Sequence, residues 1–427
     1  MPAPDASVPD VSVPDVSVPD VSVIVGAYEA MPYLIRCLES VEAQTLGARR
    51  IELIAVDDGS TDGTGAYLEE FAARTAVPTR VVRQANSGGP SGPRNVGLGM
   101  ARGRYVFFLD ADDYLADEAL ASMLAMADRA GTDVVVGKVE GVNRGAPKSM
   151  WKRTADRVDV YDSPVIFTLS AQKLFRRELI TRLGLRFDEG LRTGEDALFT
   201  MEAYIRGNGV SVFADHTCYY LVGRDDGKHA TKSGDHTHRF DSARAMMALI
   251  HDLVPAGPKR DRLLVRPFTV GLIQQFGHRI VRDSPEIRRH KLELAAPLME
   301  TYWSPEVARR IKVAERLRLE CVALGRLDLL ADILAFIKAG TEPEVVLRGR
   351  RRTPYLAYPH FGDPRSPLPD AAFEVTIRDW VGKPGGRTIE PPRVTRQRRS
   401  LTRRLVRGVR AWGKGVRPGR SLSGQAS

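Results

Sequence analysis

The chain has 427 residues, more than one ordinary domain holds, and its 43% hydrophobic and 27% charged residues are typical of a soluble globular protein. Its three cysteines, Cys37, Cys218 and Cys321, are odd in number and far apart, which argues against a disulfide framework. No apolar run approaches the roughly 20 residues that span a bilayer, and the N-terminus lacks the features of a signal peptide. We therefore expect a cytosolic protein.

The net charge of +10 is concentrated at one end of the chain. Residues 391–427 contain eleven Lys and Arg and no acidic residue, so residues 1–390 have a formal charge of −1. Apolar residues recur at helical spacing among the arginines of 400–412, and such a basic amphipathic helix, ending here at Trp412, is typical of contact with a membrane surface or a polyanion. The alternative is a disordered basic tail, because several glycines weaken the helix. Nucleic acid is not expected, because no other aromatic residue interleaves with the basic ones.

The first part of the chain alternates between strands and helices. Residues 8–22 repeat VPDVS three times, and proline at every fifth position predicts a disordered leader over residues 1–20. Apolar, β-branched runs predict strands at 21–25, 51–56, 79–83 and 105–109, with helices between them. Short connections between alternating strands and helices predict an α/β domain with a mostly parallel sheet and helices on both faces. Ligands bind such sheets at the carboxyl ends of the strands.

The second part is organised differently. A strand is predicted at 134–136, a helix start at Ser163-Pro164 and a helix over 195–206. From about 240 to 345 the pattern is helical almost throughout. We therefore expect the α/β domain to cover 21–235, followed by a helical domain over 236–350, a small β-containing segment over 351–390 and the basic tail over 391–427.

Acidic residues gather where two of the predicted strands end. Asp57 and Asp58 follow the second strand, and Asp110, Asp112 and Asp113 follow the strand at 105–109. Oxygen-rich clusters suit Mg²⁺ or Mn²⁺, which proteins bind through one or two carboxylates together with substrate phosphates. Helix capping is the alternative, by Ser60 or Asp62 in the first cluster and by Asp112 or Asp117 in the second, but it leaves part of each cluster unexplained.

Three further loops carry candidate residues. NSGGPSGPRN (86–95) is rich in glycine and places Arg94 at a helix start, although no phosphate-loop or dinucleotide-binding motif is present. In RTGEDALF (192–199), Asp196 either forms a capping box with Thr193 or acts as a general base. Basic residues of 219–232 either clamp phosphate or form a solvated turn; these are Arg224, Lys228, His229 and Lys232.

Taken together, these motifs resemble the inverting glycosyltransferases of family 2, which have the GT-A fold. The resemblance covers about residues 20–235 and rests on VSVIV, VDDGSTDGT, a loop with GPRNVG, LDADD and GEDALF, in this order. NSGGPSGPRNVG, VGKVEGVNRGAPKSMWK (136–152) and FTLSAQKLF (167–175) are similar to the bacterial wall teichoic acid enzymes that attach N-acetylglucosamine to poly(ribitol phosphate). The chain departs from many relatives at GAYEA (26–30), where they have a Pro-x-Tyr-Asn turn.

The resemblance implies a role for each matching residue. Asp58 would bind the uracil and Asp110 the ribose, while Arg224 and His229 would hold the leaving diphosphate. Asp112 would ligate the metal, Asp196 would be the catalytic base, and Glu195 would contact the sugar or the acceptor. The residues implied to bind the donor are Ala27, Tyr28, Asp58, Arg94, Asp110, Arg224 and His229.

The resemblance also implies a reaction and its partners. A UDP-sugar, with N-acetylglucosamine as the expected sugar, would donate to a hydroxyl of a polyanionic glycopolymer with Mn²⁺ or Mg²⁺ as cofactor and a β linkage as the result. Relatives form trimers, so an oligomer is an expectation, as is attachment to the inner membrane face. Two alternatives remain at this point: another acceptor, such as capsule, lipid or an antibiotic scaffold, or a non-catalytic protein that binds glycans or polyanions.

Overall fold

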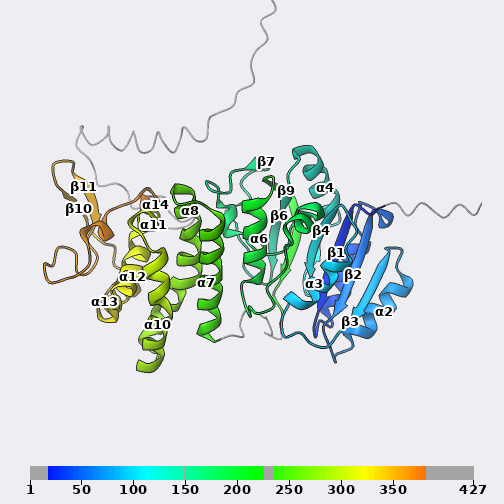
Figure 1. Ribbon diagram of the computed structural model, residues 1–427, viewed down its shortest axis with the longest axis horizontal. Helices are drawn as coiled ribbons and strands as arrows, with labels where there is room; N and C mark the ends of the chain where they lie inside the picture. The colour runs from blue at the N-terminus through cyan, green and yellow to red at the C-terminus, as the bar shows by residue number, and fades with distance from the viewer. Residues whose placement is uncertain (1–17, 149, 226–234, 381–427) are drawn as a thin grey trace, which may run out of the picture. The chain divides into compact units, whose positions relative to one another are not determined.

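The computed structural model describes residues 18–148, 150–225 and 235–380 (Figure 1). The chain forms two compact units, Met1–Pro267 and Phe268–Ser427. The predicted basic tail, nearly all of the predicted leader and His229 lie outside the described residues.

The first unit is built on one mixed sheet. Its strands lie in the order β3-β2-β1-β4-β8-β6-β9-β5, and β7 pairs with β9. The strand bounds are β1 Val21–Ala27, β2 Ile51–Asp57, β3 Thr79–Arg83, β4 Tyr105–Asp110, β5 Tyr114–Leu115, β6 Val134–Val142, β7 Ala155–Val158, β8 Leu174–Arg176 and β9 Val210–Val222.

Strands β3, β2, β1 and β4 are parallel, as the alternation of strands and helices predicted. The rest of the sheet is mixed, because β8 runs antiparallel to both of its neighbours, β4 and β6. β6 and β9 are parallel to each other, and the short strands β5 and β7 are antiparallel to β9. The reversed direction of β8 places the residues that precede it beside the carboxyl end of β4.

Helices α1 to α6 lie between strands in the chain, and α7 and α8 come after the last strand of the sheet (Figure 1). Their bounds are α1 Tyr33–Glu42, α2 Thr64–Arg74, α3 Ser91–Met100, α4 Ala119–Ala130, α5 Arg177–Leu183, α6 Glu195–Arg206, α7 His236–Leu253 and α8 Pro258–Arg266, with 3₁₀ turns at η1 Ala48–Arg50 and η2 Pro164–Phe167. The helix start predicted at Ser163-Pro164 leads only to η2, because the backbone leaves the helical region at Thr168. The carbonyl of Thr168 accepts instead from the hydroxyl of Tyr204 on α6 (3.1 Å).

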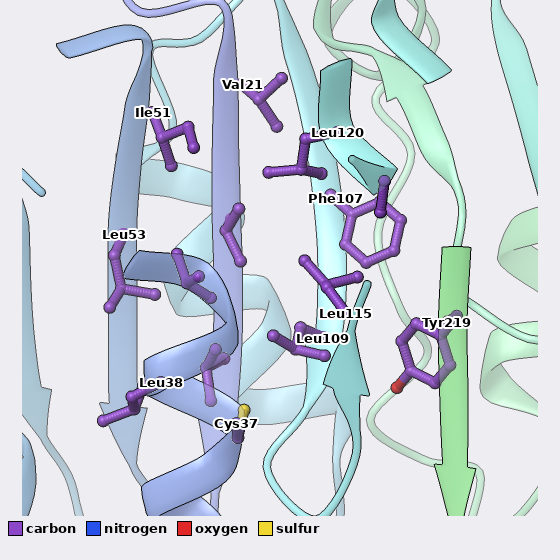
Figure 2. Packing of buried hydrophobic residues seen from close by; sticks show 14 of the residues in the cluster. Val21, Cys37, Leu38, Ile51, Leu53, Phe107, Leu109, Leu115, Leu120 and Tyr219 are labelled. Carbon is purple, nitrogen blue, oxygen red and sulfur yellow. The ribbon is translucent and has the colours of Figure 1, made fainter. Parts of the chain in front are cut away.

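The core of this unit explains why the sheet is stable at its centre. Every residue of β2 is buried, and β1 is buried at all but one position, as expected for parallel strands covered on both faces. Figure 2 shows side chains from these strands beside Leu38 of α1 and Leu120 of α4. A rigid, covered sheet of this kind holds the loops at its carboxyl edge in fixed positions.

The second unit is mainly helical. Its elements begin with the π-helical turn η4 Pro267–Leu272, followed by α9 Ile273–Gln275, η5 His278–Val281, α10 Pro285–Tyr302, α11 Pro305–Ala308, α12 Val313–Ala323, α13 Leu327–Lys338, β10 Val345–Arg348, β11 Thr353–Leu356, η6 Asp370–Phe373 and α14 Ile377–Trp380. β10 and β11 form an antiparallel pair. Arg316 is 1% exposed, and its Nε donates to the carbonyl of Ala372 (2.9 Å), which ties η6 to α12.

The start of the helical part and the expected lack of a membrane span can both be compared with the structure. α7 begins at His236, where the helical part was expected to begin, but α7 and α8 belong by their contacts to the first unit. In the residues that the structure describes, no helix combines the length and the apolar character that crossing a membrane requires.

Candidate active site

The candidate site lies at the carboxyl edge of β1, β2 and β4. In the register of the sheet, Ala27 at the end of β1 faces Asp57, and its neighbour Gly26 faces Asp110. The two acidic strand ends predicted from the sequence therefore flank the end of β1. The loops that follow these strands form the site.

Asp58 organises two of these loops. Its backbone N–H donates to the carbonyl of Ala27 (2.8 Å), and its carboxylate accepts from the backbone N–H (3.0 Å) and hydroxyl (2.9 Å) of Ser87 and from the amide of Gln84 (2.5 Å). The side chain is 2% exposed. Gly59 is required beside it, because its φ of +80° favours glycine and a Cβ there would lie 2.7 Å from the backbone nitrogen of Asn86.

The loop after β1 is held by the loop after β2. Ala27 is buried, whereas Tyr28 is 54% exposed. Glu29 accepts from the backbone N–H (2.8 Å) and the hydroxyl (2.9 Å) of Thr61. Asp62 accepts from the backbone N–H of Met31 (2.9 Å) as well as that of Thr64, but the N-cap of α2 is Gly63 and no side-chain cap hydrogen bond is formed there.

Arg94, near the start of α3, joins two carboxylates that are distant in the sequence. Its guanidinium donates to Asp110 (2.8 Å) and to Glu195 (3.1 Å), and it lies over the ring of Phe187. Burial opposes a charged guanidinium, but Asp110 and Glu195 together raise the pKa of Arg94. Burial, followed by the charge of Asp196, raises the pKa of Glu195. Arg94 therefore stays charged and fixes Asp110 against the start of α6.

Gln172 is a contact of Asp110 that the sequence analysis missed. Its side-chain amide donates to the second carboxylate oxygen of Asp110. The contact follows from the direction of β8, because Leu174 pairs with Phe107 and the residues before it continue toward the end of β4. Gln172 stands in FTLSAQKLF, a stretch that carried the family resemblance but was not assigned a role.

The acidic residues after β4 have separate environments. Asp113 is 3% exposed and accepts from the hydroxyl of Tyr219 (2.8 Å) and the backbone N–H of Val222 (2.7 Å). Burial, with Asp110 and Asp112 nearby, raises the pKa of Asp113 to about 8. Asp112 is half-buried and lines a cavity of about 220 Å³ together with Tyr33. Of these acids, Asp112 is the one that faces this cavity without being fully buried.

Arg224 reaches the same region from the end of β9. Its guanidinium donates to the carbonyl of Glu29 (3.1 Å) and lies 5.0 Å from the ring centre of Tyr33. Its neighbour Asp225 donates its backbone N–H to the Tyr33 hydroxyl (3.0 Å) and lines the cavity that Asp112 lines. The structure thus places Arg224 beside Tyr33, a residue of the cavity that Asp112 lines.

Asp196 is the second residue of α6, where the sequence predicted it. The N-cap of α6 is Gly194 with a left-handed backbone and no side-chain cap hydrogen bond. The hydroxyl of Thr193 instead contacts that of Ser242 (2.9 Å), so the capping box is not formed. Asp196 is half-buried; burial raises the pKa of its carboxyl, and the positive charge of Arg94 opposes this rise. A carboxylate of this kind suits a general base.

The structure brings several of the predicted residues together in small groups at this edge of the sheet. Ion pairs join Arg94, Asp110 and Glu195, and Asp196 follows Glu195 on α6. Asp58 and Ala27 lie at the adjacent strand ends, while Asp112 and Arg224 flank Tyr33. Tyr28 is largely exposed, and His229 falls outside the described residues.

A divalent metal fits the residues present only in the form predicted, with substrate oxygens completing its ligands. In the described residues no three His, Cys, Asp or Glu side chains are grouped to hold a metal ion. Asp110 is bound by Arg94 and Gln172, and both oxygens of Asp113 accept hydrogen bonds. Asp112, whose carboxylate lines the cavity, fits a site that uses one or two carboxylates together with substrate phosphates.

Comparison with known proteins identifies the domain that carries this site. The model of the family "Glycosyl transferase family 2" matches residues 22–194, which hold the residues predicted to bind the donor up to Asp110. Residues 22–194 are a family 2 glycosyltransferase domain. The model "Glycosyl transferase TarS linker domain" matches residues 237–334, so the predicted family and the predicted helical part are both confirmed.

Two curated relatives share 39% identity with the chain. One is the poly(ribitol-phosphate) beta-glucosyltransferase of Bacillus spizizenii, over 208 residues, 48% of this chain and 33% of that protein. The other is the poly(ribitol-phosphate) beta-N-acetylglucosaminyltransferase TarS of Staphylococcus aureus, over 212 residues, 49% of this chain and 37% of TarS. The chain thus covers about a third of the length of each of these relatives.

A solved structure of TarS residues 1–349 in complex with UDP-GlcNAc is similar to a larger part of the chain. The TM-score is 0.71 at 28% identity, over 81% of this chain and 98% of that one. The structure of the longer TarS chain aligns with 84% of this chain and 60% of its own length, with a TM-score of 0.69. The predicted GT-A fold, followed by a helical part and a small β element, is confirmed.

Proposed function

We propose that the chain is an inverting glycosyltransferase that transfers a sugar from a UDP-sugar to a hydroxyl of poly(ribitol phosphate). The observation that carries the proposal is the cluster of Arg94, Asp110, Glu195 and Asp196, with a half-buried carboxylate at the start of α6. The relatives named above act on this polymer by their descriptions, and the solved TarS complex contains UDP-GlcNAc.

In the proposed reaction Asp196 is the general base. The acceptor hydroxyl attacks the anomeric carbon from the face opposite the diphosphate, its oxygen forms the new glycosidic bond, and its proton passes to Asp196. The bond from that carbon to the diphosphate oxygen breaks, and UDP leaves with the bonding electrons. One displacement inverts the anomeric centre, so an α-linked donor gives a β-linked product.

The remaining residues bind and orient the donor. Asp58 binds the uracil at the end of β2, and Asp110, fixed by Arg94 and Gln172, binds the ribose. Arg224 is placed to stabilise the charge on the leaving diphosphate, as cationic groups do in phosphoryl-containing sites. Asp112 would hold Mn²⁺ or Mg²⁺, which supplies further positive charge to the diphosphate when bound.

N-acetylglucosamine is the proposed sugar and glucose the second candidate. The description of TarS and its UDP-GlcNAc complex favour N-acetylglucosamine. The glucosyltransferase of Bacillus spizizenii, which is also 39% identical to this chain, favours glucose. Attachment to a membrane surface through residues 391–427, assembly into an oligomer and the cytosolic location remain predictions from the sequence.

The test is UDP release in the presence of Mn²⁺, with UDP-GlcNAc, UDP-glucose and UDP-galactose each offered with and without poly(ribitol phosphate). The Asp196→Asn variant, which keeps the size of the side chain and removes its basicity, is the matched control. The proposal predicts polymer-dependent release with one sugar and a loss of about 100-fold or more in the variant. UDP release that does not depend on the polymer would refute the proposed acceptor. UDP release that is unchanged in Asp196→Asn would refute Asp196 as the base.

A further inference from the structure

Lys173 is a buried cation to which the proposed reaction gives no role. Its side chain is 1% exposed, and its ammonium donates to the backbone carbonyl of Ser170. In the described residues it forms no ion pair with a carboxylate. Burying an ammonium without a paired carboxylate costs several kcal/mol, so packing alone does not explain a lysine here.

The position of Lys173 follows from contacts with α6. The carbonyl of Ser170 that accepts from Lys173 also accepts from the hydroxyl of Thr200 (3.3 Å). Thr200 lies one helical turn after Asp196, so the two side chains share one face of α6. One turn further, the hydroxyl of Tyr204 donates to the carbonyl of Thr168 (3.1 Å). The segment 168–173 therefore lies along the face of α6 that carries the proposed base.

A second buried cation acts on the same carboxylate. Arg266 is the last residue of α8, and its Nε has no hydrogen-bond partner in the described part of the chain. Burial lowers the pKa of Arg266, and the charge of Asp196 opposes this. Neither Lys173 nor Arg266 forms an ion pair with Asp196 among the described residues, and the carboxylate accepts from the backbone N–H of Ala197 (2.6 Å).

We propose that Lys173 is a positioning residue for Asp196: together with Arg266 it supplies positive charge beside the base while leaving Oδ2, the oxygen that Ala197 does not contact, to the acceptor hydroxyl. The inference rests on the proposed function, because it assigns Asp196 the role of base. A direct ion pair would hold the carboxylate ionised but would occupy an oxygen that must accept the proton. Charge placed nearby, without contact, avoids this conflict.

The electrostatics around Asp196 agree with this role. Burial lowers the pKa of Lys173 to about 7, and Asp196 opposes the decrease. The charged groups that face Asp196 are Glu195 on its own helix, Arg94 from α3, Arg266 from α8 and Lys173 before β8. Lys173 gains its full charge as the pH falls below about 7, and the raised pKa of Asp196 makes this carboxyl more easily protonated in the same direction of pH change.

The test compares Lys173→Met, which is unbranched and uncharged and only one atom shorter, with Lys173→Arg, which keeps the charge. Lys138→Met is the matched control, because Lys138 on β6 is a partly exposed lysine that forms an ion pair with Glu140. The measurement is kcat/KM for transfer to the polymer from pH 5 to 9, with the affinity for UDP measured in parallel.

The inference predicts that Lys173→Met moves the acid limb of the profile to higher pH by about one unit, about a tenfold loss on that limb. Activity should approach that of the wild type at pH 9, and the affinity for UDP should not change. The acid limb of Lys173→Arg and that of Lys138→Met should both lie at the pH of the wild type. A uniform loss at every pH, or an unchanged profile, would overturn the inference.

A second readout separates this inference from the proposed function and from a failure to fold. The carboxyl titration of Asp196, followed by carbon NMR on the full chain, should show a higher pKa in Lys173→Met and in Arg266→Met than in the wild type. If the wild type transfers no sugar, the proposed function fails, and this titration still decides whether the two cations act on Asp196. If Lys173→Met does not fold, Arg266→Met decides, and equal titration of Asp196 in it and the wild type refutes the account.

Discussion

Replacing Arg94 by methionine should lower the free energy of unfolding of the first unit by about 3 kcal/mol at pH 7. Arg94 is 8% exposed and donates at 2.8 Å to Asp110 and at 3.1 Å to Glu195, which is itself 7% exposed. Breaking a buried pair by removing one partner costs about 3–5 kcal/mol, because the other charge stays buried. The lower end applies here because Asp110 retains its hydrogen bond from Gln172.

The loss of unfolding free energy in Arg94→Met should depend on pH, and the pKa of Glu195 decides whether the loss grows or shrinks as the pH rises. Burial and the charge of Asp196 raise the folded-state pKa of Glu195 above its unfolded value, and Arg94 opposes this rise. A group with a raised folded pKa contributes stability below its unfolded pKa, and this contribution is lost as the pH rises through the folded pKa. Without Arg94 the folded pKa is higher still, so the destabilisation by Arg94→Met should grow as the pH rises above the unfolded pKa of a glutamate.

Hydrogen exchange of the β4 and α6 amides measures this opening free energy within the first unit. The double variant Arg94→Met/Glu195→Gln, which removes the stranded charge, should recover about half of the loss. Arg129→Met is the remote control, since both partners of its ion pair with Asp156 are exposed and such a pair contributes little to stability. A loss below 1 kcal/mol for Arg94→Met that is the same at pH 5 and pH 8 would refute the reasoning.

Three further predictions concern the neighbours of this pair. Asp112→Asn should weaken UDP binding by about tenfold when Mn²⁺ is present and change it little when Mn²⁺ is removed, as calorimetry would measure; equal weakening in both conditions would contradict a metal at Asp112. Tyr219→Phe should cost about 1–2 kcal/mol of stability, because it removes the hydroxyl that donates to buried Asp113, and a thermal melt without change would contradict this. Gln172→Leu should raise the KM for the UDP-sugar several-fold by releasing one oxygen of Asp110, with little change in kcat; an unchanged KM would remove Gln172 from the site.

The sequence predicted the parts of the fold that local patterns specify. Apolar runs and helical periodicity predicted the strand over 105–109 and the helix over 195–206, and the structure has β4 Tyr105–Asp110 and α6 Glu195–Arg206. Parallel neighbours then placed Asp58 and Asp110 at one edge, because the carboxyl ends of parallel strands meet there. The shared location of these two acidic residues was therefore accessible to reasoning from the sequence.

Contacts between distant segments were not accessible. β8 has three residues, Leu174–Arg176, too few for a period to be detected, yet its reversed direction brings Gln172 to Asp110 and Lys173 to α6. Arg94 and Glu195 are separated by 101 residues, and no local pattern in either segment indicates the pair. The helix predicted from Ser163-Pro164 ends after four residues because Thr168 packs against α6 through Tyr204, which is a tertiary effect.

The most direct test of the account is analysis of the polymer itself after incubation with the chain, UDP-GlcNAc and Mn²⁺. The account predicts that poly(ribitol phosphate) acquires N-acetylglucosamine in a β linkage, visible as a new anomeric proton with a large coupling constant, and that Asp196→Asn gives none. An unmodified polymer would contradict the proposed acceptor or donor. A sugar attached in an α linkage would contradict the single displacement with Asp196 as its base.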